Sequence, residues 1–196
     1  MKNFVRMVML STVLLTLAVG SVSAQMGSFK DNRDGKTYQS VKIGKQTWMA
    51  ENLNYQTASS KCYGNDNSNC EKYGRLYDWN TAMTVCPAGW HLPSRGQWSL
   101  LVDDVGESWA GKLKSTSGWI ENKNGTDDYG FSAFPSGWRT SNGSFVETGI
   151  NAFWWTSTDM TGGGAKAFRR GIVTRTHPSE DYSSKIESFS VRCVAN

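Results

Sequence analysis

The chain has 196 residues and a formal charge of +4, from 21 basic and 17 acidic side chains. Aromatic residues make up 12% of it, with nine tryptophans, and there are 20 glycines. The length suits one domain, the composition favours strands and loops, and the near-balanced charge argues against a nucleic-acid-binding protein.

The first 24 residues have the pattern of a secretory signal peptide. Lys2 and Arg6 precede an apolar run at 7–19, and the small residues Val22-Ser23-Ala24 follow as a cleavage site. The apolar run is shorter than the ~20 residues that span a bilayer, although an uncleaved anchor is the alternative. Cleavage would lower the charge from +4 to +2 and leave 25–196 as one exported domain without a transmembrane segment. We therefore expect a periplasmic, cell-surface or secreted protein.

The four cysteines all follow the predicted signal peptide, at Cys62, Cys70, Cys86 and Cys193. An even number of cysteines in an exported chain favours disulfides over free thiols. Three pairings are possible, and we favour a local Cys62–Cys70 bridge together with Cys86–Cys193. The second bridge would close a long loop, which in the chain-entropy model stabilises the fold by up to about 4–5 kcal/mol.

The first predicted elements are strands. Asn32–Leu53 contains two apolar segments separated by Gly44-Lys45, which suits a two-residue hairpin. The polar stretch Thr57–Lys72 is interpreted as a loop that the Cys62–Cys70 disulfide closes. Asp78 is placed to cap a short helix that runs to about Val85.

The strongest helix signal lies between Ser94 and Gly106. Ser94 and Gln97 form a capping box, and Gly106 suits the end of the helix. A shorter helix is predicted over Glu107–Lys114. Between Ser94 and Gly106, the apolar residues follow helical spacing, at Trp98, Leu101, Val102 and Val105.

From Trp119 onward the sequence alternates between strand and turn patterns. Asn124-Gly125 and Asn142-Gly143 mark turns. We therefore interpret their N-x-S/T triplets as turn sequences and not as glycosylation sites. Phe189, Val191 and Cys193 alternate on one face of a last strand. We predict one α+β domain with helices early and the sheet late, with strands in GFSAF, SFVET, AFWWTST, KAFRRGIV and ESFSVRCV.

Six ordered blocks resemble the Fibrobacter succinogenes major paralogous domain, a family of exported bacterial proteins. The resemblance covers about Asp31–Asn196. It implies a C-type-lectin-like α+β fold, with two or three short helices packed on twisted antiparallel sheets, long loops, and the terminal strands in one sheet. The family has no assigned biochemical role, and a fold does not carry function. The blocks are DNRDGKTYQSVKIGKQTWMAENLNY, YGRLYDWNTAM, CPAGWHLPSRGQW, DDYGFSAFPSGWR, WWTST and SVRCV.

LPSRGQW and VRCV are also similar to segments of the formylglycine-generating enzymes. Their copper chemistry needs a close cysteine pair late in the chain, and here Cys193 stands alone there. A Cys86–His91 nucleophile pair is disfavoured, because export favours an oxidised Cys86 and leaves His91 to pack or bond beside Trp90. The G-x-S-x-G motif of serine hydrolases is absent.

Acidic residues offer two further hypotheses. A glycosidase would need two of the carboxylates across a cleft, and calcium could be held by scattered oxygens, because neither site has a fixed spacing. We therefore predict no catalytic residues, no metal site and no cofactor, while leaving calcium open. The carboxylates are Asp103, Asp104, Asp127, Asp128, Glu147 and Asp159.

Ligand binding is the favoured hypothesis, through loop aromatics and basic side chains. Strand alternation would place Arg169 and Arg170 on opposite faces. Six tryptophans of the structural blocks (Trp48, Trp79, Trp90, Trp98, Trp154 and Trp155) are assigned to the core, while Trp109, Trp119 and Trp138 are free to bind. The predicted ligand-binding residues are Trp109, Trp119, Asp127, Asp128, Tyr129, Trp138, Arg139, Arg169, Arg170 and Arg175.

The sequence thus predicts an exported, non-catalytic domain that recognises a glycan or a surface protein, with no nucleic-acid partner. The first alternative is a hydrolase or modifying enzyme acting on extracellular polysaccharide. The second is a structural subunit of a surface assembly.

Overall fold

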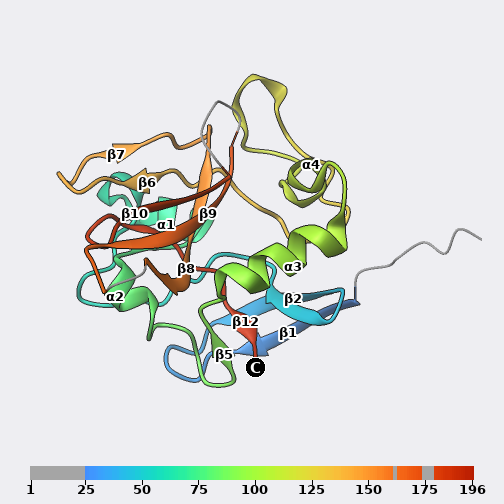
Figure 1. Ribbon diagram of the computed structural model, residues 1–196, viewed down its shortest axis with the longest axis horizontal. Coiled ribbons are helices and arrows are strands. Elements are labelled where there is room, and N and C mark those ends of the chain that lie inside the picture. Colours follow the sequence, from blue (N-terminus) through green and yellow to red (C-terminus); the bar gives the residue numbers. More distant parts are fainter. Residues whose placement is uncertain (1–24, 161–162, 174–178) are drawn as a thin grey trace, which may run out of the picture.

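The computed structural model describes residues 25–160, 163–173 and 179–196. Two five-stranded sheets form the framework, and a long helix lies between them (Figure 1). The first sheet has the order β1-β2-β3-β12-β5, with β1 at Gln25–Lys30, β2 at Thr37–Ile43, β3 at Gln46–Met49, β12 at Val194–Ala195 and β5 at Trp90–His91. The chain is thus α+β, as predicted, and β12 near its end joins the early strands.

The second sheet has the order β10-β9-β8-β11-β4. Its pairs are antiparallel except β11 with β8, which is parallel. A small two-stranded sheet of β6 (Trp138–Arg139) and β7 (Phe145–Val146) lies beside it, bridged at Arg139 to Ser188. The members of the second sheet are β4 at Leu76–Tyr77, β8 at Ala152–Asp159, β9 at Lys166–Ile172, β10 at Glu180–Ser184 and β11 at Phe189–Ser190.

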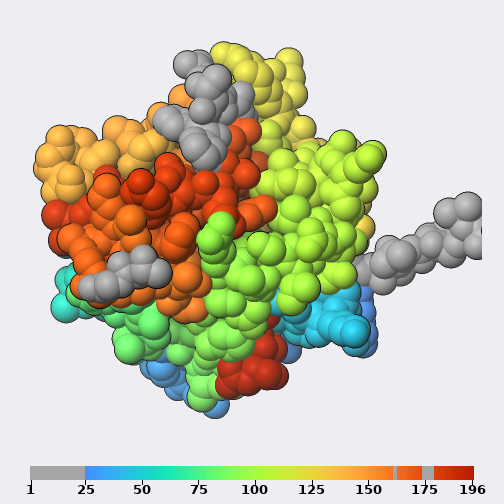
Figure 2. Space-filling model, in the orientation of Figure 1, coloured from blue at the N-terminus to red at the C-terminus, as the bar shows by residue number. Residues whose placement is uncertain are grey.

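The longest helix, α3 at Arg95–Val105, begins and ends where the sequence predicts. Both hydrogen bonds of the Ser94–Gln97 capping box are present, and Gly106 ends the helix. The other helices are α1 (Asn67–Tyr73), α2 (Trp79–Ala82), α4 (Trp109–Leu113) and two short 3-10 turns, η1 (Tyr63–Asn65) and η2 (Ile120–Asn122). In Figure 2 the green surface of the α3–α4 segment meets the orange-red surface of the second sheet.

Strand β8 is buried on both faces and separates two apolar clusters. Trp154 packs with Val41, Trp98 and Phe131 in the first cluster. The neighbouring residues along β8 pack with Leu53, Tyr77, Phe189, Val191 and Cys193 in the second. Phe189, Val191 and Cys193 thus pack on the same side, as predicted, but the predicted single last strand was wrong, because the segment is divided between β11 in the second sheet and β12 in the first.

The predicted hairpin at Gly44-Lys45 is confirmed, because Ile43 pairs with Gln46 across it. Gly44 has a φ of 57°, and a Cβ built there would lie 1.8 Å from Asp104 Oδ2 on α3. The position therefore combines a left-handed turn with close approach to a helix, and both favour glycine.

Several predicted boundaries were wrong. Thr57–Lys72 is not only a loop, because Asp66 accepts a hydrogen bond from Ser68 N and starts α1. The helix capped by Asp78 ends at Ala82 and not near Val85. GFSAF forms only an isolated bridge at Ala133, and SFVET is a strand only at Phe145–Val146.

Candidate functional site

Two adjoining hollows lie between the start of β2, the segment after β3, and α1. Their volumes are about 510 and 550 Å³, and they share a wall of Lys36, Asn54, Cys70 and Glu71. We call the pair the β2–α1 groove. The first hollow is further lined by Thr37, Tyr38, Glu51, Asn52, Lys72, Tyr73, Gly74, Phe134 and Arg192, and the second by Arg33, Asp34, Tyr55, Gln56, Asn67 and Arg75.

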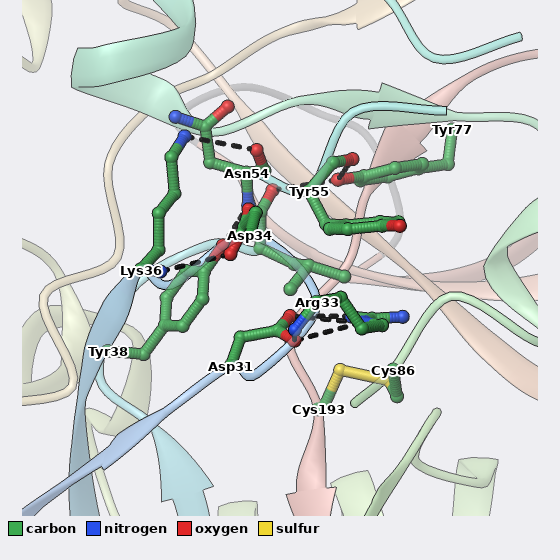
Figure 3. A network of polar contacts seen from close by, with 11 residues as sticks. Asp31, Arg33, Asp34, Lys36, Tyr38, Asn54, Tyr55, Tyr77, Cys86 and Cys193 are labelled. Carbon is green, nitrogen blue, oxygen red and sulfur yellow. Dashed lines mark hydrogen bonds and ion pairs between the residues drawn. A yellow bond between two sulfur atoms is a disulfide. The ribbon is translucent and has the colours of Figure 1, made fainter. Parts of the chain in front are cut away.

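The turn before β2 is held by an ion pair between Asp31 and Arg33. Arg33 Nη2 lies 2.6 Å from Asp31 Oδ2, and the Asp31 side chain is 1% exposed. The hydrogen bond from Arg33 lowers the pKa of Asp31, and the same bond raises the pKa of Arg33. The Arg33 guanidinium also lies 3.9 Å from the centre of the Tyr55 ring, so the pair fixes one end of the second hollow (Figure 3).

Two buried tyrosines hold the segment that separates the hollows. Asn54 N donates to Tyr38 Oη at 3.1 Å, and Tyr77 Oη donates to the carbonyl oxygen of Tyr55 at 2.7 Å. Burial raises the pKa of Tyr38 to about 12 and the pKa of Tyr77 well above its ordinary range, so both hydroxyls stay neutral. Lys36 Nζ donates to Asn54 O at 3.3 Å, as Figure 3 shows.

The floor of the first hollow is a buried polar network around Asn52. Its Oδ1 accepts hydrogen bonds from Trp154 Nε1 at 2.8 Å and from Arg192 Nη2 at 3.0 Å. Its Nδ2 donates to Tyr73 O at 2.8 Å. The asparagine therefore joins the second sheet to the end of α1.

Arg192 is a buried cation at this floor, with 1% of its surface exposed. Its guanidinium also donates to the carbonyl oxygen of Phe131 and lies 4.2 Å from the centre of that ring. Within the residues that the structure describes, Arg192 forms no ion pair with a carboxylate. Burial lowers its pKa to about 9.

Helix α1 forms the wall opposite β2. The Cys62–Cys70 disulfide anchors the helix, and Cys70 lies on the wall shared by both hollows. The helix ends at Gly74, whose φ is 74° and whose Cβ would lie 2.6 Å from Asn52 Cβ. Glycine at this position lets the helix end meet the floor of the first hollow.

The predicted disulfides are both present, so a Cys86–His91 nucleophile pair is excluded by the Cys86–Cys193 bond. His91 is held by two side chains instead. Its Nδ1 lies 2.6 Å from Asn196 Oδ1, and its Nε2 lies 2.9 Å from Gln97 Nε2. The ring thereby connects β5 to the start of α3 and to β12, which is a structural role.

The predicted ligand-binding residues do not form one site. Arg169 and Arg170 lie on opposite faces of β9, as expected, but both are 8% exposed. Arg169 lies over Phe153 and pairs with Asp181, whereas Arg170 lies over Trp109 and pairs with Glu180.

The predicted aromatic residues are mostly packed against the core. Trp119 is 4% exposed and donates to Ala133 O, so the expectation that its ring is free was wrong. Trp138 packs edge-on against Phe153, and Trp109 and Tyr129 pack against the first cluster. Of the six tryptophans assigned to the core, Trp90 is only half-buried, and the other five are buried.

The remaining predicted residues lie in loops. Asp127 accepts hydrogen bonds from Ser132 N and Oγ, whereas Asp128 lines a separate hollow of about 300 Å³ next to Lys112. Arg139 is half-buried, and its backbone N–H donates to Ser188 O. Arg175 lies outside the described residues. No residue of the β2–α1 groove was among the predicted binding residues.

The carboxylates proposed for catalysis are dispersed. Asp159 pairs with Lys185 at 2.8 Å, Glu147 accepts from Asn151 Nδ2, and Asp103 and Asp104 are exposed on α3. Within residues 25–160, 163–173 and 179–196, His, Cys, Asp and Glu form no group of three that could hold a metal ion.

A search of the described ranges reveals no helix that is both long and apolar enough to cross a membrane.

Comparison with known proteins identifies one family. The sequence profile of the Fibrobacter succinogenes major domain matches residues 41–195. No curated protein and no solved structure matches the chain. The chain therefore belongs to the Fibrobacter succinogenes major domain family, as the six sequence blocks predicted.

Proposed function

We propose that this member of the family is a non-catalytic ligand-binding domain, and that it binds a saccharide in the β2–α1 groove. The observation that supports this is the pair of adjoining hollows. Each falls within the ~300–1,000 Å³ range of ordinary ligand sites. Two hollows that share a wall suit a chain of sugar rings better than one compact molecule.

The groove lining favours a polar, hydroxyl-rich ligand. Amide groups of Asn52, Asn54 and Gln56 alternate with charged side chains, and the rings of Tyr55 and Phe134 supply apolar surface. Such a lining offers both hydrogen-bond donors and hydrogen-bond acceptors, and a sugar hydroxyl can bond to either. A surface protein is the alternative ligand.

A hydrolase remains the competing proposal, because Glu51 and Glu71 both line the first hollow. Both carboxylates have structural contacts that favour the binding role. Glu51 accepts from Gln39 N at 2.7 Å, and Glu71 lies 4.0 Å from Lys36 Nζ. Residues 1–24, which carry the predicted signal, and the two disulfides support an exported bacterial surface protein.

We also propose that the fold is C-type-lectin-like. The early strands share one sheet with β12, a second sheet carries the later strands, and Cys86 bridges the last segment of the chain. Long loops connect the elements between α4 and β8.

The test is a glycan array probed with the exported domain, with and without EDTA, followed by calorimetry on each hit. Thr37→Trp adds a large side chain at the edge of the first hollow and should abolish binding. Gln39→Trp, on the same strand and exposed outside the groove, is the matched control. Binding that is lost equally in both variants, or in neither, would contradict the proposed site.

The array also separates the alternatives. Loss of signal with EDTA would reveal a calcium requirement. Release of shortened oligosaccharides, abolished by Glu71→Gln, would establish a hydrolase and overturn the non-catalytic proposal.

A further inference from the structure

We infer that the groove selects an acidic saccharide, and that Arg75 binds a ligand carboxylate in the second hollow. This inference rests on the proposed function, because it names the ligand class of the same groove.

Arg75 is held in place by its backbone and lines the second hollow. Its N–H donates to Leu53 O at 3.0 Å, directly before β4. Its Nη2 donates to Gln56 Oε1 at 3.0 Å, and its Nη1 donates to Ser60 Oγ at 3.4 Å. A guanidinium has five N–H groups, so much of its hydrogen-bonding capacity is unfilled, and the buried Nε has no partner in the described part of the chain.

The other cations of the second hollow already have counter-charges. Arg33 pairs with the buried Asp31, and Lys36 Nζ lies 4.0 Å from Glu71. Arg75 forms no ion pair with any described carboxylate. Its planar fork matches the two oxygens of a carboxylate, which is the geometry of strong bidentate recognition.

The first hollow adds two cations that have no carboxylate partner among the described residues, Arg192 at the floor and the exposed Lys72. Among the described residues that line the groove, five are basic and three are acidic. Glu71 faces Lys36, whereas the exposed Asp34 and Glu51 accept backbone hydrogen bonds and are screened by water. With Asp31 counted against Arg33, one positive charge remains in excess at the groove, which favours an anionic ligand.

The test compares one oligomer in two charge states. Oligogalacturonate and the same oligomer with its carboxylates reduced to alcohols are titrated into the protein by calorimetry at low and high salt. We expect the uronate to bind at least about tenfold more tightly, and added salt to reduce that preference. Arg75→Gln should remove the preference, while Lys45→Gln, in the exposed turn between β2 and β3 and outside the groove lining, should retain it.

A second variant does not depend on removing Arg75. Gln56 is exposed, and Gln56→Glu places a carboxylate next to the Arg75 guanidinium, so it should compete with the ligand and weaken uronate binding. Equal binding of both oligomers would overturn the acidic-ligand inference while supporting saccharide binding. Uronate binding that neither variant changes would overturn the role of Arg75. Failure of both oligomers and of the glycan array would overturn the proposed function itself.

Discussion

Asn52 and Arg192 lie 140 residues apart in the sequence, yet Asn52 Oδ1 accepts two hydrogen bonds from the Arg192 guanidinium. The amide oxygen takes the place of a carboxylate beside a fully buried cation. The same oxygen accepts from Trp154, so three donors depend on one acceptor. Loss of this one acceptor would leave buried donors of both Arg192 and Trp154 unpaired.

Asn52→Ala should therefore destabilise the protein strongly. It leaves Arg192 Nε and Trp154 Nε1 without their acceptor, and we expect the free energy of unfolding to fall by about 3 kcal/mol. Urea denaturation followed by tryptophan fluorescence measures the change. Asn54→Ala is the control, because Asn54 is half-buried and its side chain donates only a 3.4 Å bond to Glu71. Equal losses in the two variants would contradict the special role of Asn52.

The two disulfides should contribute unequally to stability. Cys86–Cys193 spans 107 residues and Cys62–Cys70 spans 8. In the chain-entropy model, replacing the long-range pair by alanine should cost about 5 kcal/mol and replacing the local pair about 2–3 kcal/mol. Chemical denaturation of the two double variants tests the order. A larger loss from the local pair would show that native-state contacts of α1 outweigh the loop entropy.

The Asp31–Arg33 pair predicts how stability depends on pH. The pKa of Asp31 lies below its ordinary value of 3.8, because Arg33 donates hydrogen bonds to the carboxylate. The stabilisation is therefore present above pH 3.8 and is lost as the pH falls through the lower pKa of the folded state. Thermal denaturation across pH should show that Asp31→Asn loses this acid-dependent component. Asp34→Asn, whose carboxylate is exposed, should keep the wild-type profile.

Gly44→Ala should destabilise the β2–β3 hairpin for two reasons, the positive φ and the contact with Asp104. Gly89→Ala separates them, because Gly89 has a φ of 84° but its Cβ would meet no described atom within 4 Å. We expect about 1 kcal/mol from the backbone conformation alone and at least about 1 kcal/mol more at Gly44. Differential scanning calorimetry of both variants gives the comparison. Equal melting temperatures would show that the Asp104 side chain moves aside without cost.

Local signals predicted the local elements of this fold. The Ser94–Gln97 box and Gly106 define α3 within a dozen residues of sequence, and both bonds of the box are present. Helix α1 was missed because its cap, Asp66, lies among asparagines and serines that equally favour turns. Short elements of this kind are decided by tertiary contacts, here the disulfide at Cys70.

The binding residues were harder to predict for a related reason. The shared wall of the groove joins Lys36 to Glu71, and its floor contains Arg192 from the last segment of the chain, so no sequence window holds the site. Arg169 and Arg170 were predicted as binding residues, but they are buried. Their charge suggested exposure, but Asp181 and Glu180 on the neighbouring strand pair with them directly, which allows both to be buried.

The Cys62–Cys70 bridge has a practical consequence for handling the protein. Because Cys70 lies on the wall common to both hollows, oxidation of this pair sets the position of α1 against the groove. Protein produced in a reducing cytosol would lack the Cys62–Cys70 disulfide, even where the two apolar clusters form normally. Binding measurements therefore require protein folded under oxidising conditions, with complete thiol loss verified by mass spectrometry before any ligand is judged inactive.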